Sequence, residues 1–266
     1  MSEGRTDLLH NLMLMFSDLS GLGFSVGGVG SYMSSLDSHH AQRALVLRHD
    51  VDADMAAAAQ LADWERSLGI CSTYLVMIQS PLYNLFSRAS CRSMDTILSA
   101  GHEIGLHFDI AFYESETEDL TDLIDSQAQT ISDFFSVPVE SFSAHQPTAR
   151  ALDPQSYKGR LTSCYTNPFM TRLAYFSDSN RERDLRELED LATSLTLRSL
   201  EDTPGIQLLI HPMWWIYEDQ DPAAVWERAL YSNIAQAQQQ LASTERAFGP
   251  PREVHLSKPS EECLGN

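Results

Sequence analysis

The chain has 266 residues, of which 43% are hydrophobic and 21% are charged, as in ordinary folded globular proteins. Its 37 Asp and Glu residues outnumber its 18 Lys and Arg residues, and the formal net charge of −19 disfavours nucleic acid and anionic lipid surfaces as partners. No apolar run reaches the ~18 residues that a membrane-spanning helix needs, so we expect no membrane span.

Apolar strand-like runs alternate with helical patterns along most of the chain. In chain order we predict a strand at 44–47, a helix at 55–68, a strand at 72–78, a helix ending at Gly101, a strand at 103–107, a helix with an apolar face between Leu120 and Phe135, strands at 139–144, 173–176 and 206–210, and a helix at 221–249. Strands that alternate with helices predict an α/β fold with a parallel sheet, open or closed into a barrel.

No stretch rich in Pro, Gly and Ser divides the chain, so we predict one domain over residues 1–266. In this prediction residues 1–40 form an N-terminal extension, and the helix at 221–249 lies at the C-terminal end of the domain. Glu3 and Asp7 lie where a secretory signal peptide carries positive charge, and the four cysteines form no CxxC motif. We therefore expect a cytoplasmic protein with reduced thiols.

Four histidines lie at or just after the carboxyl end of a predicted strand: His49, His107, His145 and His211. In parallel α/β folds the carboxyl ends of the strands and the loops after them form the active face. One such histidine alone is most simply a hydrogen-bonded structural residue, whereas four at equivalent positions indicate a functional site.

The first cluster is RHDVD at residues 48–52. Because side chains alternate along a strand, Arg48, Asp50 and Asp52 share one face. Two carboxylates in this arrangement can divide two tasks, one binding a metal ion and the other serving as a base. A solvated acidic turn is the simpler alternative, but an arginine beside two aspartates in an apolar strand favours a structured ion cluster.

The second cluster, GHEIGLHFD at residues 101–109, places His107 and Asp109 on one strand face with Gly105. Imidazole nitrogen and carboxylate oxygen are ordinary ligands of zinc and similar divalent ions, and Gly105 allows close approach of the backbone. We interpret His102, which precedes the strand, as a structural residue.

Two further clusters follow strands in the middle and near the end of the chain. His145 precedes Pro147, and His211 precedes the adjacent pair Trp214 and Trp215. Adjacent tryptophans in a loop either cover the core or form a wall on which a sugar stacks, since an indole suits a site with one wet side.

Together these clusters resemble the polysaccharide deacetylase superfamily, also known as the NodB-homology or carbohydrate esterase family 4 superfamily, over residues 44–215. The order of the motifs carries the resemblance, and GHEIGLH at 101–107 is its most specific part. The chain looks closer to divergent members of bacterial surface-glycan pathways than to secreted chitin deacetylases. The resemblance implies a distorted (β/α)7 barrel, a divalent metal that is usually zinc, and hydrolysis of an N-acetyl or O-acetyl group on a sugar.

The resemblance also implies which residues bind the metal. Asp52 resembles the family's metal-binding aspartate, and His107 resembles its first metal histidine. The family's second metal histidine usually comes four residues later, where this chain has Ala111. We therefore expect His145 as the third ligand, with Asp109 as the alternative.

The same resemblance implies the catalytic residues. Asp50 resembles the base, His211 the general acid, and Asp178 the later aspartate that orients neighbouring groups. The middle motif lacks the arginine that normally braces the base, and Arg48, on the strand face of Asp50, can take that role.

The function implied by the resemblance is the removal of an acetyl group from a glycan, a lipid-linked glycan or a nucleotide sugar. Trp214 and Trp215 are the expected substrate-binding residues, and they favour a sugar over other amides. Two alternatives stay open: an amidohydrolase of the same architecture that acts on a non-sugar amide, and a catalytically inactive homologue that binds glycan.

Overall fold

The structure is a computed structural model that describes residues 8–36, 43–113, 119–153, 155–179, 205–217, 219 and 221–249. The pair His39 and His40, interpreted from the sequence as an exposed loop, lies outside the described residues. Strands are β1 (Phe24–Gly27), β2 (Arg43–Val51), β3 (Thr73–Val76), β4 (Glu103–Asp109), β5 (Val139–His145), β6 (Thr162–Ser163), β7 (Ala174–Ser177) and β8 (Gly205–Ile210). Helices are α1 (Leu8–Gly21), α2 (Val29–Ser35), α3 (Met55–Ser67), α4 (Arg88–Ser99), η1 (Ile110–Phe112), α5 (Thr121–Phe135), α6 (Ala149–Leu152), α7 (Phe169–Arg172), α9 (Pro212–Tyr217) and α10 (Pro222–Thr244).

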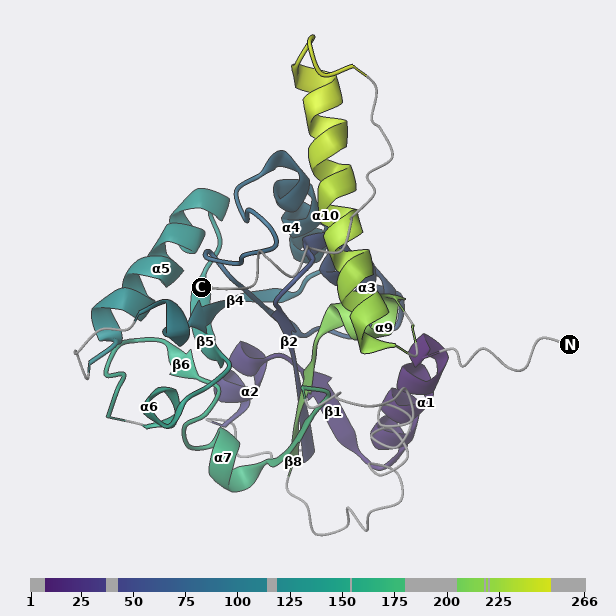
Figure 1. Cartoon of the computed structure of the whole chain (residues 1–266). Coiled ribbons are helices and arrows are strands. Elements are labelled where there is room, and N and C mark those ends of the chain that lie inside the picture. Colours follow the sequence, from purple (N-terminus) through teal and green to yellow (C-terminus); the bar gives the residue numbers. More distant parts are fainter. Residues whose placement is uncertain are drawn as a thin grey trace, which may run out of the picture.

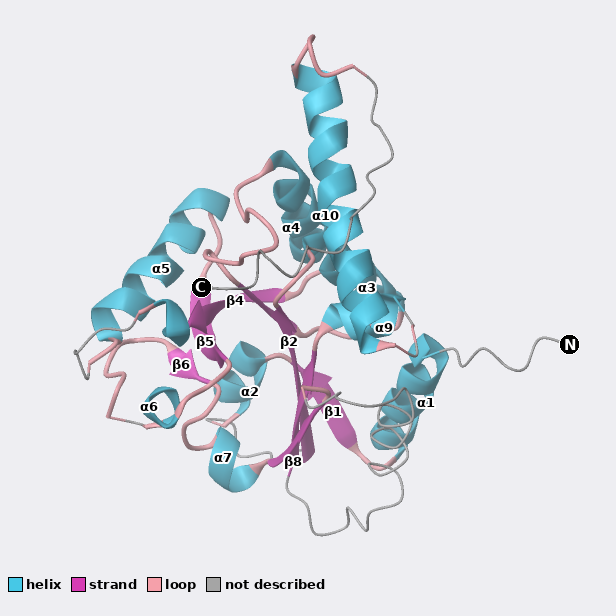
Figure 2. Cartoon of the chain, in the orientation of Figure 1, coloured by secondary structure: helices cyan, strands magenta, loops and turns pink. Residues whose placement is uncertain are grey.

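All eight described strands belong to one curled parallel sheet with helices around it (Figure 1 and Figure 2). Seven of them follow the order β6-β5-β4-β3-β2-β8-β7, and β1 pairs in addition with β2. In the part of the chain that the structure describes, the end strands β6 and β7 do not pair with each other, so the barrel stays open at this seam. The distorted (β/α)7 barrel expected from the sequence is confirmed.

The two faces of β2 show how the sequence directs side chains into and out of the barrel. Leu45 and Leu47 point outward and are fully buried against α1, α3 and α9. Arg48 and Asp50 point inward and are also buried, with exposed fractions of 0% and 2%. Because side chains alternate along a strand, apolar residues support the helices while charged residues face the barrel interior.

The N-terminal segment, predicted as an extension, is part of the barrel. Strand β1 pairs with the first half of β2, beside the point where β3 begins. Helix α2 packs Val29 and Tyr32 against the inward side chains Val46 and Leu75 and so closes the interior at the end opposite to the carboxyl ends of the strands. Glu103 accepts hydrogen bonds of 2.8 Å from the N–H groups at the start of α2, which gives this carboxylate a structural role.

Helix α10 begins as predicted and ends earlier than predicted. Asp221 caps it by accepting the N–H of Ala223 at 2.9 Å, but the helix ends at Thr244 rather than at 249. Its first turns are anchored through buried Val225 and Ala229, whereas its later turns project from the body of the molecule (Figure 1). None of the described helices is long and apolar enough to span a bilayer.

Candidate active site

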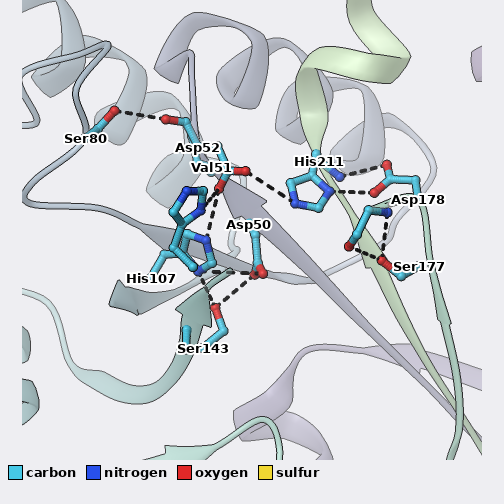
Figure 3. Close-up of polar contacts among 12 residues, drawn as sticks. Asp50, Val51, Asp52, Ser80, His107, Ser143, Ser177, Asp178 and His211 are labelled. Atoms are coloured by element: carbon cyan, nitrogen blue, oxygen red, sulfur yellow. Dashed lines mark hydrogen bonds and ion pairs between the residues drawn. The ribbon is translucent and has the colours of Figure 1, made fainter. Parts of the chain in front are cut away.

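Polar side chains at the carboxyl ends of the strands meet around a cavity of about 520 Å³. Asp50 and Asp52 come from β2 and the residue after it, His107 from β4, His145 from β5, and His211 follows β8 (Figure 3). All five line this cavity, so the structure brings together residues that are up to 161 positions apart in the sequence. This is the arrangement expected for an active face of a parallel barrel.

Three of these residues form a group that can hold a metal ion. Oδ1 of Asp52 lies 3.0 Å from Nε2 of His107 and 3.4 Å from Nδ1 of His145. One ligand atom from each of the three residues lies within 4.8 Å of the others. One carboxylate oxygen and two imidazole nitrogens form a donor set that suits zinc and similar divalent ions.

The structure separates the two residues considered as a third metal ligand, His145 and Asp109. His145 is the register partner of Asp109 on the neighbouring parallel strand, so it reaches the same level of the barrel. Asp109 itself is engaged elsewhere, because its Oδ1 accepts the N–H of Ala111 at 3.0 Å and caps the η1 turn. Of the two, His145 belongs to the group that can hold a metal ion.

The hydrogen bonds around His107 fix which of its nitrogens faces the group. Oγ of Ser143 donates to Asp50 at 3.1 Å, so it accepts from Nδ1 of His107 at 2.6 Å. In the neutral ring the proton on Nδ1 leaves Nε2 with a lone pair, and Nε2 faces the carboxylate oxygen of Asp52. Both facing atoms are buried and have no hydrogen-bond partner. Two unpaired acceptors 3.0 Å apart repel each other, and a cation between them removes that cost, so the residues fit a metal ion.

The carboxyl group of Asp52 is held in its ionised form. Burial acts to raise its pKa, but the nearby His211 and the contact with His145 outweigh burial and keep the pKa well below the ordinary value. The contact with Asp52 in turn raises the pKa of the His145 imidazole. The centre of the group is therefore a carboxylate, the form that a metal ligand needs.

Asp50 lies two residues before Asp52 on the same strand face, deeper in the barrel, and contacts two partners. The Ser143 hydroxyl donates to one oxygen at 3.1 Å, and the Arg48 guanidinium lies 3.7 Å from the other. Arg48 is fully buried and also lies over the ring of Tyr165, at 5.2 Å from the centroid. The bracing contact expected between Arg48 and Asp50 is present as a buried ion pair.

His211 is oriented by Asp178, which follows β7. Oδ1 of Asp178 lies 2.6 Å from Nδ1 of His211, and Oδ2 accepts the backbone N–H of His211 and the indole N–H of Trp215, both at 2.9 Å. These bonds leave Nε2 of His211 facing Asp52 at 3.5 Å. Burial lowers the pKa of His211, but Asp178 and Asp52 outweigh it and raise the pKa to about 10. The imidazole is therefore protonated at neutral pH and offers a proton from Nε2.

The two adjacent tryptophans have different environments. Trp214 is 6% exposed, belongs to the hydrophobic core and also lines the cavity. Trp215 is 1% exposed, lies in the hydrophobic core and donates its indole N–H to Asp178. The prediction that Trp215 forms part of a substrate wall is wrong, because successive side chains of the short α9 helix point in different directions.

Two histidines that sit close to the site in sequence point away from it. His49 lies on the outer face of β2, where its Nε2 is 2.8 Å from the buried carboxylate of Glu65 on α3. His102 accepts the N–H of Ser72 at 3.1 Å and donates to a backbone carbonyl, as expected for a structural residue. His49 therefore belongs to the packing of α3 on the sheet and not to the active face.

Several residues in or next to the cavity were missed from the sequence. Ser143 shares the inward face of β5 with His145, so strand alternation offered a signal for it. Tyr165 and Tyr175 line the cavity beside the open seam between β6 and β7. Trp226 lines it from α10, and the sequence pattern placed this residue on the apolar face of the helix.

Comparison with known proteins gives matches among solved structures. A family 4 acetyl xylan esterase from Clostridium thermocellum, solved with a cobalt ion, is 15% identical with a TM-score of 0.39, over 74% of this chain and 84% of that one. A chitin deacetylase from Colletotrichum lindemuthianum is 14% identical with a TM-score of 0.42, over 71% of this chain and 81% of that one. A family 4 pseudoenzyme from Bacillus anthracis is 13% identical with a TM-score of 0.39, over 76% of this chain and 63% of that one.

The first and the third of these structures are described as family 4 proteins. No protein-family model matches the chain, and no curated protein matches it.

Proposed function

We propose that the protein is a metal-dependent hydrolase that removes an acetyl group from an acetylated amino sugar. The observation that carries the proposal is the pair of buried, unpartnered acceptors on Asp52 and His107, which a divalent cation completes. A protonated His211 lies on the other side of the Asp52 carboxylate, at 3.5 Å. A cation site, a base and an acid around one cavity are the parts that hydrolysis of an amide requires.

Asp52, His107 and His145 would hold the metal. A divalent ion bound there supplies Lewis-acid catalysis, polarising the acyl carbonyl and making water more acidic. Asp50 is the base: its carboxylate lines the cavity, is 3% exposed and is fixed by Ser143 and Arg48. Asp50 takes the proton of a water molecule as the water oxygen attacks the carbonyl carbon.

His211 completes the reaction as the general acid. The new C–O bond converts the acyl group to acetic acid as the C–N bond breaks, and Nε2 of His211 gives its proton to the leaving amine. Asp178 keeps the ring oriented and stabilises the protonated imidazole. Asp50 takes one proton and His211 gives one, so one water and one amide yield acetic acid and an amine.

The cavity supports a sugar as the substrate class. Trp214, Tyr165 and Tyr175 contribute aromatic surface to its lining, while Ser177 and Ser179 contribute hydroxyl groups. A wall with both apolar faces and hydroxyl groups suits a ring that carries C–H bonds on its faces and hydroxyls on its edge. We include glycans, lipid-linked glycans and nucleotide sugars in the proposed class.

The experiment that tests the proposal measures acetate release from a panel of acetylated compounds after loading with zinc, cobalt or manganese. The panel contains N-acetylglucosamine glycosides, a uridine-diphosphate N-acetylhexosamine, an O-acetylated xyloside and a cyclic ureide. The Asp50→Asn variant keeps the ligands Asp52, His107 and His145, so it separates catalysis from metal binding. We expect zinc-loaded protein to release acetate from an N-acetylated sugar and Asp50→Asn to release none.

Other outcomes correspond to other functions. Turnover of the cyclic ureide alone would assign the site to a non-sugar amidohydrolase. Sugar binding with no turnover in metal-loaded protein would assign an inactive glycan-binding homologue. Either result would refute the proposed deacetylase.

A further inference from the structure

An exposed tryptophan from the C-terminal helix reaches the candidate active site. Trp226 lies in the second turn of α10 and lines the same cavity as the catalytic residues. Its exposed fraction is 38%, against 6% for Trp214, which also lines the cavity. The two indoles meet edge to face, with ring centroids 5.7 Å apart and an angle of 88° between the planes.

The helix that carries Trp226 is fixed relative to the site. Val225 and Ala229, on either side of it in the sequence, are fully buried in the core. The side-chain amide of Asn233 donates at 2.8 Å to the carbonyl of Ala53, the residue that follows the metal-site carboxylate Asp52. An exposed apolar ring on an anchored helix turn costs free energy in water, and a ligand that covers the ring recovers that cost.

The order of residues along the cavity shows which part of a substrate Trp226 meets. Nε2 of His211 lies 3.5 Å from Oδ2 of Asp52. The backbone N–H of Trp214 donates to the carbonyl of His211 at 3.1 Å. The indole of Trp226, which comes from a different helix, contacts the indole of Trp214. His211 is the proton donor to the leaving amine, so the sugar that carries the amine lies on the tryptophan side of the metal group.

We propose that Trp226 stacks on the sugar ring next to the one that carries the acetamido group, so that the substrate contains at least two linked sugars. This inference rests on the proposed function, because it uses His211 as the donor to the amine. Among the described residues Trp226 makes a ring contact with Trp214 and none with His211, so we assign the acid and the outer indole to two different sugar rings. The cavity of about 520 Å³ lies within the ~300–1,000 Å³ of sites for drug-sized ligands, which are about as large as a disaccharide.

The test uses calorimetric titration with β-1,4-linked N-acetylglucosamine as monomer, dimer and trimer. The full chain carries Asp50→Asn throughout, which keeps the sugars intact during titration. Trp226→Ala removes the ring, and Trp226→Phe keeps an aromatic face. Tyr231→Ala is the matched control, because Tyr231 is an exposed aromatic residue on the same helix, 42% exposed, that does not line the cavity.

We expect the dimer to bind about tenfold more tightly than the monomer, with this preference lost in Trp226→Ala and kept in Trp226→Phe and Tyr231→Ala. Equal affinity for monomer and dimer, or a preference that survives in Trp226→Ala, would overturn the inference.

Acetate release from the same three sugars by the chain with Asp50 intact tests the proposed function separately. Release that Trp226→Ala leaves unchanged in KM overturns only the stacking role. A length preference that depends on Trp226, found without any acetate release, overturns only the hydrolase.

Discussion

Replacing Asp178 by Asn tests the assignment of His211 as a general acid. The side chain of Asp178 is fully buried. It accepts hydrogen bonds from the backbone N–H and the Nδ1–H of His211 and from the indole N–H of Trp215. The change keeps the shape of the side chain and removes its charge. Asp178 touches none of the three residues of the metal group, so we expect the variant to fold and to keep its metal.

The pKa of His211 sets the size of the effect. The difference between about 10 and the ordinary value of 6.5 corresponds to a preference of about 5 kcal/mol for the protonated ring, which Asp178 and Asp52 share. Without Asp178, only the Asp52 and Asp50 carboxylates oppose the effect of burial on the pKa of His211. We therefore expect the pKa to fall by several units, His211 to be neutral at pH 7.5, and kcat to drop about 10²–10⁴-fold with little change in KM.

The assay is a nitrogen-15 NMR titration of the histidine side chains, together with kcat and metal content. Asp63→Asn is the control for loss of one carboxylate, because Asp63 is exposed on α3 in an ion pair with Arg66. A His211 pKa that stays near 10 in Asp178→Asn, or an unchanged kcat in that variant, would refute the reasoning.

The raised pKa of His211 also predicts how the stability of the protein depends on pH. A pKa raised in the folded protein contributes stability that is fully present below pH 6.5 and is lost as the pH rises from about 6.5 to about 10. Urea unfolding should show that Asp178→Asn depends less on pH across this window than the wild type does.

Three further predictions concern the residues around the site. Ser143→Ala removes the partner that fixes the tautomer of His107, so we expect about 10–100-fold weaker zinc binding in a chelator competition, and unchanged affinity would contradict that role. Arg48→Gln leaves the buried Asp50 carboxylate without its cation, so the free energy of unfolding in urea should fall by about 3–5 kcal/mol, and by less in Arg48→Lys. Glu65→Gln should cost a similar free energy but leave the metal content unchanged, because Glu65 lies on the outer face of the sheet, and loss of metal would show that the two faces are coupled.

The fold could be predicted from the sequence where elements are long enough to show a period. The apolar runs at 103–107 and 206–210 became β4 and β8, and the helix at 55–68 became α3 with Gly69 just beyond it. Strands β1 and β6, of four and two residues, were not predicted from the sequence. Their places in the sheet depend on contacts with residues far away in the chain.

The site could be predicted where strand alternation decides the direction of a side chain. That rule placed Arg48, Asp50 and Asp52 on one face of β2. His107 and Ser143 are register partners on β4 and β5, so they lie at the same level of neighbouring strands. The rule could not show that His49 packs against α3, because its partner Glu65 lies on that helix and not on a neighbouring part of the strand. Trp226 was missed for the same reason, since its role depends on where α10 docks.

The measurement that tests the central claim most directly is the metal content of the purified protein after incubation with divalent ions. Wild type is compared with His107→Ala, and with His10→Ala, which removes an exposed histidine of α1 far from the group in sequence. We predict about one zinc ion or similar ion per chain in the wild type and in His10→Ala, and none in His107→Ala. No metal in the wild type, or full occupancy in His107→Ala, would contradict the proposed metal site.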